Sequence, residues 1–268
     1  VDAHVHINEP GRTDWEGFET ATKAAAAGGI TTIVDMPLNC IPVTTTVDAL
    51  NQKIIATKDQ LWIDCGFYGG LIPDNIQDLE SLADAGVLGF KAFLSPSGID
   101  EFPNISEKHL REALHILAKK GIPVLVHAEL ENGATSSEEN KTYKYFQESR
   151  PKSWENNAIK LLIQLCREFN VHIHIVHLSS ADILPEIAQT RKDGFPLTVE
   201  TCPHYLHFSS ERISDGDTRF KCAPPIWNGE NRENLWAGLE EGIINFITSD
   251  HSPCTPELKN LEAGNFEK

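Results

Sequence analysis

The chain alternates between short apolar runs and amphipathic segments with helical spacing. Its first residues, VDAHVHI, place an apolar residue at every second position, which is typical of a β-strand. Seven further apolar runs are predicted to be strands, at 30–36, 61–69, 89–94, 122–129, 171–180, 196–203 and 244–252. These runs are nearly continuous in their apolar character, as parallel strands covered on both faces are.

Each predicted strand except the last is followed by a predicted helix, at 15–27, 47–58, 75–86, 106–121, 153–170, 181–194 and 231–242. We expect Thr13 or Asp14, Thr46 and Ser106 to cap the first, second and fourth of these helices. The polar stretch 131–151 and the segment 204–228 are predicted to be irregular. Eight β/α units in about 250 residues predict an α/β fold, a (β/α)8 TIM-type barrel. A doubly wound open sheet is the alternative, but no G-x-G-x-x-G follows the first strand.

We expect residues 1–268 to form a single barrel domain. The chain starts inside a predicted strand, without a methionine, and stops soon after the eighth strand. The barrel is therefore expected to be truncated after strand eight, with both ends incomplete.

Composition narrows the class of protein. The 268 residues are 40% hydrophobic and 23% charged, with a net charge of −16. No apolar run reaches the roughly 18 residues of a membrane span. An acidic surface disfavours nucleic acids and anionic membranes as partners. The six scattered cysteines predict free thiols and an intracellular location. We favour the cytoplasm, with the peroxisome and the mitochondrion as open alternatives.

Polar residues that bind metals stand at the carboxyl ends of five predicted strands, where such barrels carry their chemistry. They are His4 and His6, Lys91, His127, His177 and Asp250. Each has an ordinary structural explanation, such as a packed imidazole or a helix cap, but together they predict a metal site. Lys91 fits because a buried lysine loses its proton more easily, and its free amine can add CO₂ to become a carbamate.

Two other histidines, His172 and His174, stand in the strand at 171–180. Their strand parity is opposite to that of His177. We therefore expect them to be packed outside the barrel mouth.

Eight segments resemble the cyclic amidohydrolases of the amidohydrolase superfamily, a group that includes dihydroorotases, dihydropyrimidinases (hydantoinases) and allantoinases. The segments are DAHVHINEPG, AAAAGGITTIVDMP, GFKAF, PVLVHAE, HIVHLSS, ETCPHYL, KCAPPI and TSDHSPC. The resemblance covers the whole chain. In this group the barrel usually carries a small β-sandwich built from both termini, and we expect residues 1–268 not to include it.

The resemblance implies a binuclear metal centre. His4, His6 and Asp250 would hold one divalent ion, His127 and His177 the other, and Lys91, as N6-carboxylysine, would bridge them. The ions are expected to be Zn²⁺, with Mn²⁺, Co²⁺ and Fe²⁺ as alternatives. A metal-bridging hydroxide would attack the ring carbonyl, and Asp250 would carry the proton to the leaving nitrogen. The resemblance also implies a homotetramer.

The substrate is expected to be a small neutral cyclic ureide. Dihydroorotases usually have an arginine where this chain has Asn8, and an asparagine where it has Leu38. The segments EPGRTDWEGFETAT, DMPLN and TSDHSPC are most similar to those of allantoinases, which convert allantoin to allantoate in purine degradation. The resemblance places Ser252 and the backbone near Ala223 against the ring, and we add Asn39 and Asn8, although asparagine is also common in turns. A dihydropyrimidinase, hydantoinase or dihydroorotase-like enzyme and a non-catalytic scaffold are the alternatives.

Overall fold

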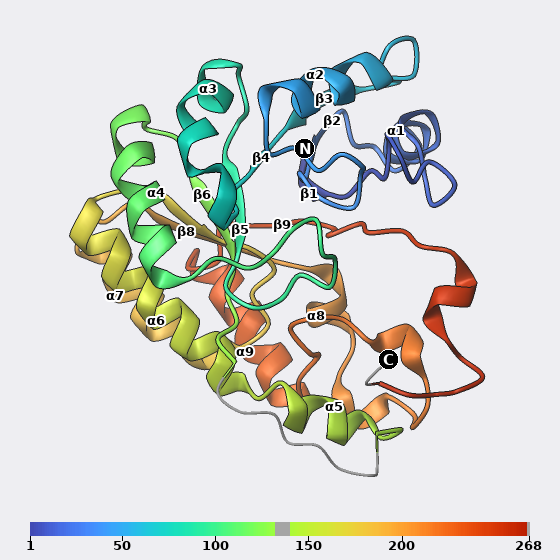
Figure 1. Ribbon diagram of the computed structural model, residues 1–268. Helices are drawn as coiled ribbons and strands as arrows, with labels where there is room; N and C mark the ends of the chain where they lie inside the picture. The colour runs from blue at the N-terminus through green and yellow to red at the C-terminus, as the bar shows by residue number, and fades with distance from the viewer. Residues whose placement is uncertain (132–139, 267–268) are drawn as a thin grey trace.

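The computed structural model describes residues 1–131 and 140–266, and its strands form two parallel sheets (Figure 1). One sheet has the order β1-β2-β3 and the other the order β4-β5-β6-β7-β8-β9. The strands are β1 Asp2–Val5, β2 Thr32–Asp35, β3 Asp64–Phe67, β4 Gly69–Gly70, β5 Phe90–Phe93, β6 Val124–His127, β7 Ile173–Ile175, β8 Leu197–Thr201 and β9 Phe246–Ile247. The predicted α/β class with parallel strands is confirmed.

The two sheets are linked through the third predicted strand, which is divided between them. β3 pairs with β2, and β4 pairs with β5, with only Tyr68 between β3 and β4. The Tyr68 N–H donates to the carbonyl of Asp35, and the next N–H, of Gly69, donates to that of Gly89. At the other ends of the sheets, Val5 forms an isolated parallel bridge with His251. The chain thus brings the end of β1 next to the segment that follows β9.

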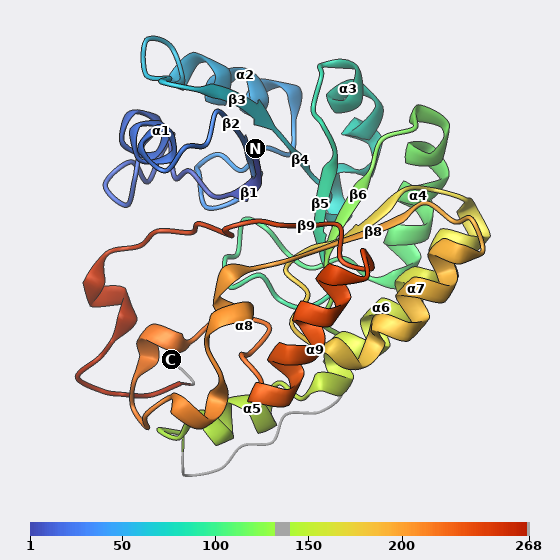
Figure 2. The ribbon, with the colours of Figure 1, turned by 180° about the vertical axis from the view of Figure 1, so that it is seen from behind.

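Helices cover the outer faces of both sheets, and Figure 2 shows them from behind. The helices are α1 Phe18–Ala27, α2 Val47–Ala56, α3 Leu79–Asp84, α4 Glu107–Lys120, α5 Tyr143–Ser149, α6 Lys152–Phe169, α7 Leu184–Lys192, α8 Pro203–His207 and α9 Gly229–Glu240. α1 and α2 accompany the first sheet, while α3, α4, α6 and α7 lie side by side along the second. No helix in the described ranges is long and apolar enough to cross a membrane.

Two of the three predicted helix caps are confirmed. Thr46 accepts a hydrogen bond from the Ala49 N–H, and Ser106 accepts one from the His109 N–H. The predicted cap of the first helix is wrong, because α1 begins only after Gly17. There the carboxylate of Glu9 accepts the Phe18 N–H at 2.9 Å and takes the place of a cap.

The predicted irregular stretch 131–151 contains the helix α5. Residues 132–139 lie outside the described part of the chain. Of the rest, Thr142 caps α5, and the buried rings of Tyr143 and Phe146 pack on Phe266. Tyr143 and Phe146 are three residues apart, so both lie on one helical face. The segment 204–228 is irregular as predicted, apart from α8 and short 3-10 turns.

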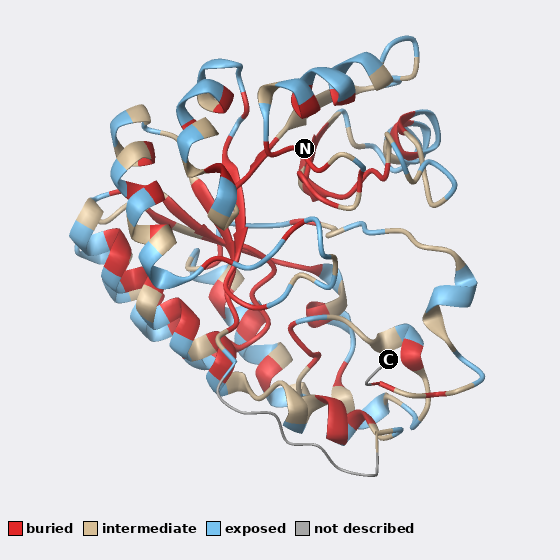
Figure 3. Cartoon of the chain, viewed as in Figure 1, coloured by how far each residue is buried: buried red, intermediate tan, exposed pale blue. Residues whose placement is uncertain are grey.

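The main core lies between the second sheet and its helices, where buried positions face inward (Figure 3). A smaller cluster includes Met36, Tyr68, Phe93, Leu125 and Val176. Complete burial of one such side chain contributes about 1.5–3 kcal/mol to folding. All six cysteines are free, as predicted.

Candidate active site

The predicted metal-binding residues meet at one cavity of about 300 Å³. Of the residues named from the sequence, the cavity is lined by His6, Leu38, Asn39, Lys91, His127, His177, Ala223, Asp250 and Ser252. His4 is completely buried, and its ring centroid lies 5.4 Å from that of His6 and 5.5 Å from that of His177. The strands therefore bring all six predicted ligands together.

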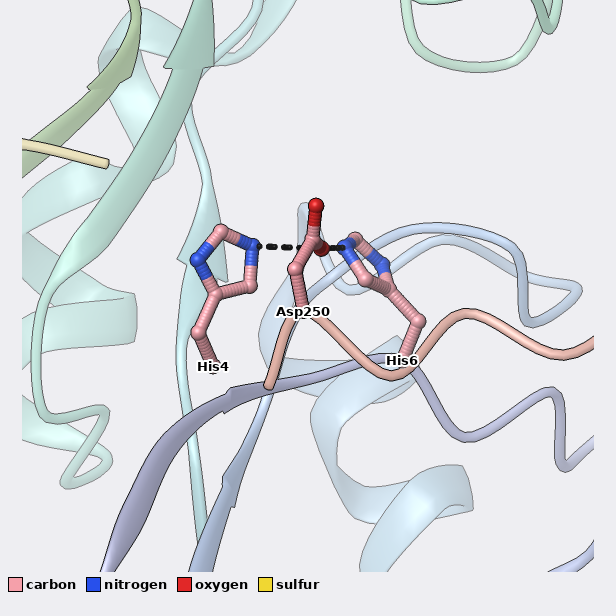
Figure 4. Close-up of side chains that lie close together, drawn as sticks. All are labelled: His4, His6 and Asp250. Atoms are coloured by element: carbon pink, nitrogen blue, oxygen red, sulfur yellow. Dashed lines mark ion pairs between the residues drawn. The ribbon is translucent and has the colours of Figure 1, made fainter. Parts of the chain in front are cut away.

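His4, His6 and Asp250, which we call the first half-site, point their ligand atoms at one another (Figure 4). Asp250 Oδ1 lies 3.1 Å from His4 Nε2 and 3.3 Å from His6 Nε2. One ligand atom from each residue lies within 4.8 Å of the others. Asp250 has a φ of 48°, a left-handed conformation that aspartate adopts more readily than most residues.

Charge in the first half-site favours an ionised carboxylate. Burial by itself lowers the pKa of His4, but the charges of Asp250 and Glu200 outweigh it and raise that pKa to about 9. Burial by itself raises the pKa of Asp250, but the charge of His4 and hydrogen bonds from His4 and His6 hold it well below its usual range. Asp250 is therefore an anion at neutral pH.

His127 and His177 form the second half-site. His127 Nδ1 lies 3.1 Å from His177 Nε2, and the two rings meet edge to face. Burial lowers the pKa of both imidazoles, and that of His177 falls well below 6.5. At neutral pH two uncharged rings thus turn a nitrogen toward each other.

Lys91 lies within electrostatic range of both half-sites. It is 1% exposed, and its Nζ lies 4.8 Å from the centroid of the Phe93 ring. Its positive charge opposes protonation of all four imidazoles of the half-sites, including His4, where the carboxylates outweigh it. Burial lowers the pKa of Lys91 itself to about 8. A fraction of this lysine, about a tenth at pH 7, is therefore a free amine, far more than for a lysine with its ordinary pKa.

The donor atoms fit divalent cations. His6 Nδ1 and His177 Nδ1 are buried atoms without a hydrogen-bond partner, and His4 Nε2 faces only the Asp250 carboxylate. A buried polar atom without a partner costs free energy, and a bound cation would give such an atom a partner. Imidazole nitrogens with a carboxylate are a donor set that Zn²⁺ and similar ions accept.

Two carboxylates that sequence reasoning missed stand behind the half-sites. Glu200 contacts Nδ1 of His4, and Glu129 contacts Nε2 of His127 at 2.7 Å. Both are at most 1% exposed. Arg150 donates to Glu129 from Nε at 3.2 Å and from Nη2 at 2.5 Å. The two glutamates could have been found from the sequence, since Glu129 follows His127 by two residues and Glu200 is a charged residue inside an apolar strand.

His174 is a packed, buried imidazole that does not line the cavity, as expected, but it is linked to the site. Its Nε2 lies 3.0 Å from Glu200, which in turn contacts His4. Strand parity does not reveal this link, because β7 ends at Ile175 and His177 has a left-handed backbone, with a φ of 41°. Alternation of side chains holds only within the strand.

The predicted substrate-binding residues divide into two groups. Asn39, Ala223 and Ser252 line the cavity, and Asn39 Nδ2 donates to Ser252 Oγ at 3.2 Å. Asn8 is fully buried and is not among the cavity-lining residues. Its amide donates to the carbonyl of Pro253 at 3.2 Å, so it joins the first strand to the segment after Asp250.

The chain is similar to several curated allantoinases. It is 50% identical to the allantoinase of Saccharomyces cerevisiae over 273 residues, which cover 99% of this chain and 59% of that protein. It is 50% identical to the allantoinase of Arabidopsis thaliana over 283 residues, which cover 100% of this chain and 56% of that protein. The chain thus spans little more than half the length of these relatives.

Solved structures show the same fold. The L-hydantoinase (dihydropyrimidinase) of Arthrobacter aurescens matches with a TM-score of 0.87 and 30% identity. The match covers 98% of this chain and 59% of that one. The fold therefore resembles the barrel domain of a hydantoinase. The sequence model of the amidohydrolase family matches residues 1–266. The chain belongs to the amidohydrolase family.

Proposed function

We propose that the protein hydrolyses the cyclic amide of allantoin to allantoate, with two divalent metal ions as cofactors. The observation that carries the proposal is the identity of about 50%, over nearly the whole chain, to proteins named allantoinases. Five of the six predicted ligands line one cavity, and the buried His4 lies beside His6 and Asp250, which supports a hydrolytic centre rather than a scaffold.

In this proposal His4, His6 and Asp250 hold one ion, and His127 and His177 hold the other. Two such ions supply a nucleophile from water at neutral pH and polarise the carbonyl that is attacked. Zn²⁺ is the proposed ion, and the donor set also suits Mn²⁺, Co²⁺ and Fe²⁺.

Lys91 contributes as a carbamate between the half-sites. Its uncharged amine forms an N–C bond to CO₂ and releases one proton, which turns a cation into an anion on a long side chain. The lowered pKa of Lys91, about 8, supports this step because it supplies the free amine.

Asp250 is the proposed catalytic residue. Its carboxylate is ionised and lines the cavity, so it can accept the proton of the attacking water. It then gives that proton to the ring nitrogen as the C–N bond breaks. The product is a carboxylate with an open ureide chain.

The pocket suits a neutral ring. Asn39, Ala223 and Ser252 line it and offer amide, backbone and hydroxyl groups to a cyclic ureide. Arg150 also lines it, but its guanidinium is paired with Glu129. A hydantoin or dihydrouracil is the second candidate substrate, supported by the structural match to a hydantoinase.

We further propose that residues 1–268 act as one domain and that their strands make a closed (β/α)8 barrel. The bridge between Val5 and His251 supports closure, because it joins the two outermost strand regions. A cytoplasmic homotetramer is the proposed form, on the family resemblance.

The test is a comparison of substrates with protein loaded with Zn²⁺ and bicarbonate. Allantoin, dihydrouracil, hydantoin and dihydroorotate are offered in parallel, and ring opening is followed. We expect allantoin to have the highest kcat/KM. A preference for dihydrouracil or hydantoin would show that allantoin is not the main substrate. No turnover with metals bound would contradict the proposal that the protein is an enzyme of this kind.

A further inference from the structure

A chain of hydrogen bonds runs from β7 and β8 to the first half-site. His172 Nε2 lies 2.7 Å from Thr198 Oγ1, and Thr198 Oγ1 lies 2.8 Å from His174 Nδ1. His174 Nε2 lies 3.0 Å from Glu200 Oε2. The other oxygen of Glu200, Oε1, contacts His4 Nδ1. This series of hydrogen bonds ends at the ring of His4, whose other nitrogen, Nε2, faces Asp250.

The position of each proton in the chain follows from the acceptors. An ionised carboxylate can only accept, so His4 Nδ1 and His174 Nε2 both donate to Glu200. When the ring proton of His174 is on Nε2, its Nδ1 accepts a hydrogen bond from the Thr198 hydroxyl. The Thr198 oxygen then accepts the N–H of His172. The tautomers of three histidines are thereby coupled.

Burial of the Glu200 carboxylate costs free energy that its contacts must offset. It is 0% exposed, and a buried charge costs several kcal/mol unless its partners compensate. Within residues 1–131 and 140–266, its carboxylate contacts the rings of His4 and His174 and, at 3.4 Å, the backbone N–H of His177. Two of these three partners belong to proposed metal ligands.

We propose that Glu200 is a positioning residue for the first half-site. It accepts the Nδ1–H of His4, so that the electron pair of Nε2 is left for the ion that His4, His6 and Asp250 would hold. His174 and Thr198 support Glu200 from behind. The inference rests on the proposed metal centre, and it assigns Glu200 no contact with substrate.

The test is a graded series of variants, read out as Zn²⁺ bound per chain and as affinity in competition with a chelator. Glu200→Ala removes the acceptor, and Glu200→Gln removes its charge. Loss of such a partner weakens metal binding by about 10- to 100-fold. We expect Glu200→Ala to have the largest effect, followed by Glu200→Gln, Thr198→Val and His172→Asn.

Matched controls separate positioning from stability. Glu155→Gln changes another buried glutamate, which accepts the backbone N–H groups of Ser179 and Ser180. Thr190→Val removes a buried hydroxyl that donates to the carbonyl of Glu186. Both controls are expected to bind two ions per chain with wild-type affinity.

The outcomes distinguish this inference from the proposed function. Absence of metal binding by the wild-type protein would overturn both. Two ions in the wild type and an unchanged affinity in Glu200→Gln and Glu200→Ala would overturn the positioning role alone.

If the Glu200 variants do not fold, neutron diffraction of the metal-loaded wild type decides. Deuterium on His4 Nδ1 and His174 Nε2 supports the proposal, and a bare Nδ1 on His4 overturns it.

Discussion

In the first half-site His4 turns Nδ1 to Glu200, and in the second His127 turns Nε2 to Glu129. Both contacts fix which nitrogen is left to face the centre, Nε2 in His4 and Nδ1 in His127. The carboxylates differ in their other partners. Glu129 is paired with Arg150, whereas Glu200 is shared by His4 and His174. One carboxylate is thus neutralised by a permanent cation, and the other only by imidazoles.

This difference affects charge more than geometry. A guanidinium beside Glu129 takes up part of its negative charge, so less of it reaches His127. The charges of Asp250 and Glu200 raise the pKa of His4 to about 9, while burial lowers that of His127. We infer that His4 is the more basic donor and that the first half-site depends more strongly on its supporting carboxylate.

The largest effect is expected for Lys91→Ala, which would break both half-sites together. Without the proposed bridge the ions lose a shared ligand, and turnover should fall about 1,000-fold or more, as loss of several kcal/mol of stabilisation requires. Metal analysis and ring-opening rates measure the change. Acetate, which can fill the vacated space with a carboxylate, should restore part of the activity. Full activity of Lys91→Ala would contradict the role of the lysine.

Glu129→Gln is expected to weaken the second half-site by about 10- to 100-fold in metal affinity while the first keeps its ion. It also leaves Arg150 without its carboxylate, which should cost about 1–3 kcal/mol in the free energy of unfolding. Glu200→Gln should show the opposite pattern, with the first half-site weakened and no cation left unpaired. Calorimetric metal titration and denaturant unfolding of the two variants test the contrast. Loss of the same ion in both would refute it.

Ser252→Ala tests the substrate side of the first half-site. The substitution removes the hydroxyl that accepts a hydrogen bond from Asn39. We expect KM for allantoin to rise about 10-fold, which corresponds to the roughly 1.4 kcal/mol of one lost hydrogen bond. The change in kcat should be smaller. Steady-state kinetics provide the measurement, with Thr190→Val as a control. An equal fall in kcat at constant KM would place Ser252 in the chemical step instead.

A further effect is expected on stability rather than on turnover, from pH at Glu155, behind the second half-site. Burial raises the pKa of Glu155 from 4.5 to about 8, so the folded protein binds more protons than the unfolded chain between these values. The contribution of this group to stability is therefore present at low pH and is lost as pH rises toward 8. Unfolding of wild type and Glu155→Gln at pH 5, 6.5 and 8 should show a difference that shrinks with pH. A constant difference would contradict the raised pKa.

The class of fold, and the meeting of the six proposed ligands in one region, could be predicted from the sequence because these depend on local periodicity and on strand ends. His4 and His6 alternate within a strand, and Lys91 is a charge in an apolar run. The sequence did not predict α5, whose helical face is made of aromatic residues in a polar stretch. It also missed the link from His174 through Glu200 to His4. That link joins three strands that are distant in sequence, and a turn at His177 hides it from parity.

The most direct test of the two half-sites is anomalous diffraction from crystals of the Zn²⁺-loaded wild-type protein. We predict two peaks, one bounded by His4, His6 and Asp250 and the other by His127 and His177, with density for a carbamate on Lys91 between them. A single peak, or zinc bound away from these residues, would contradict the account.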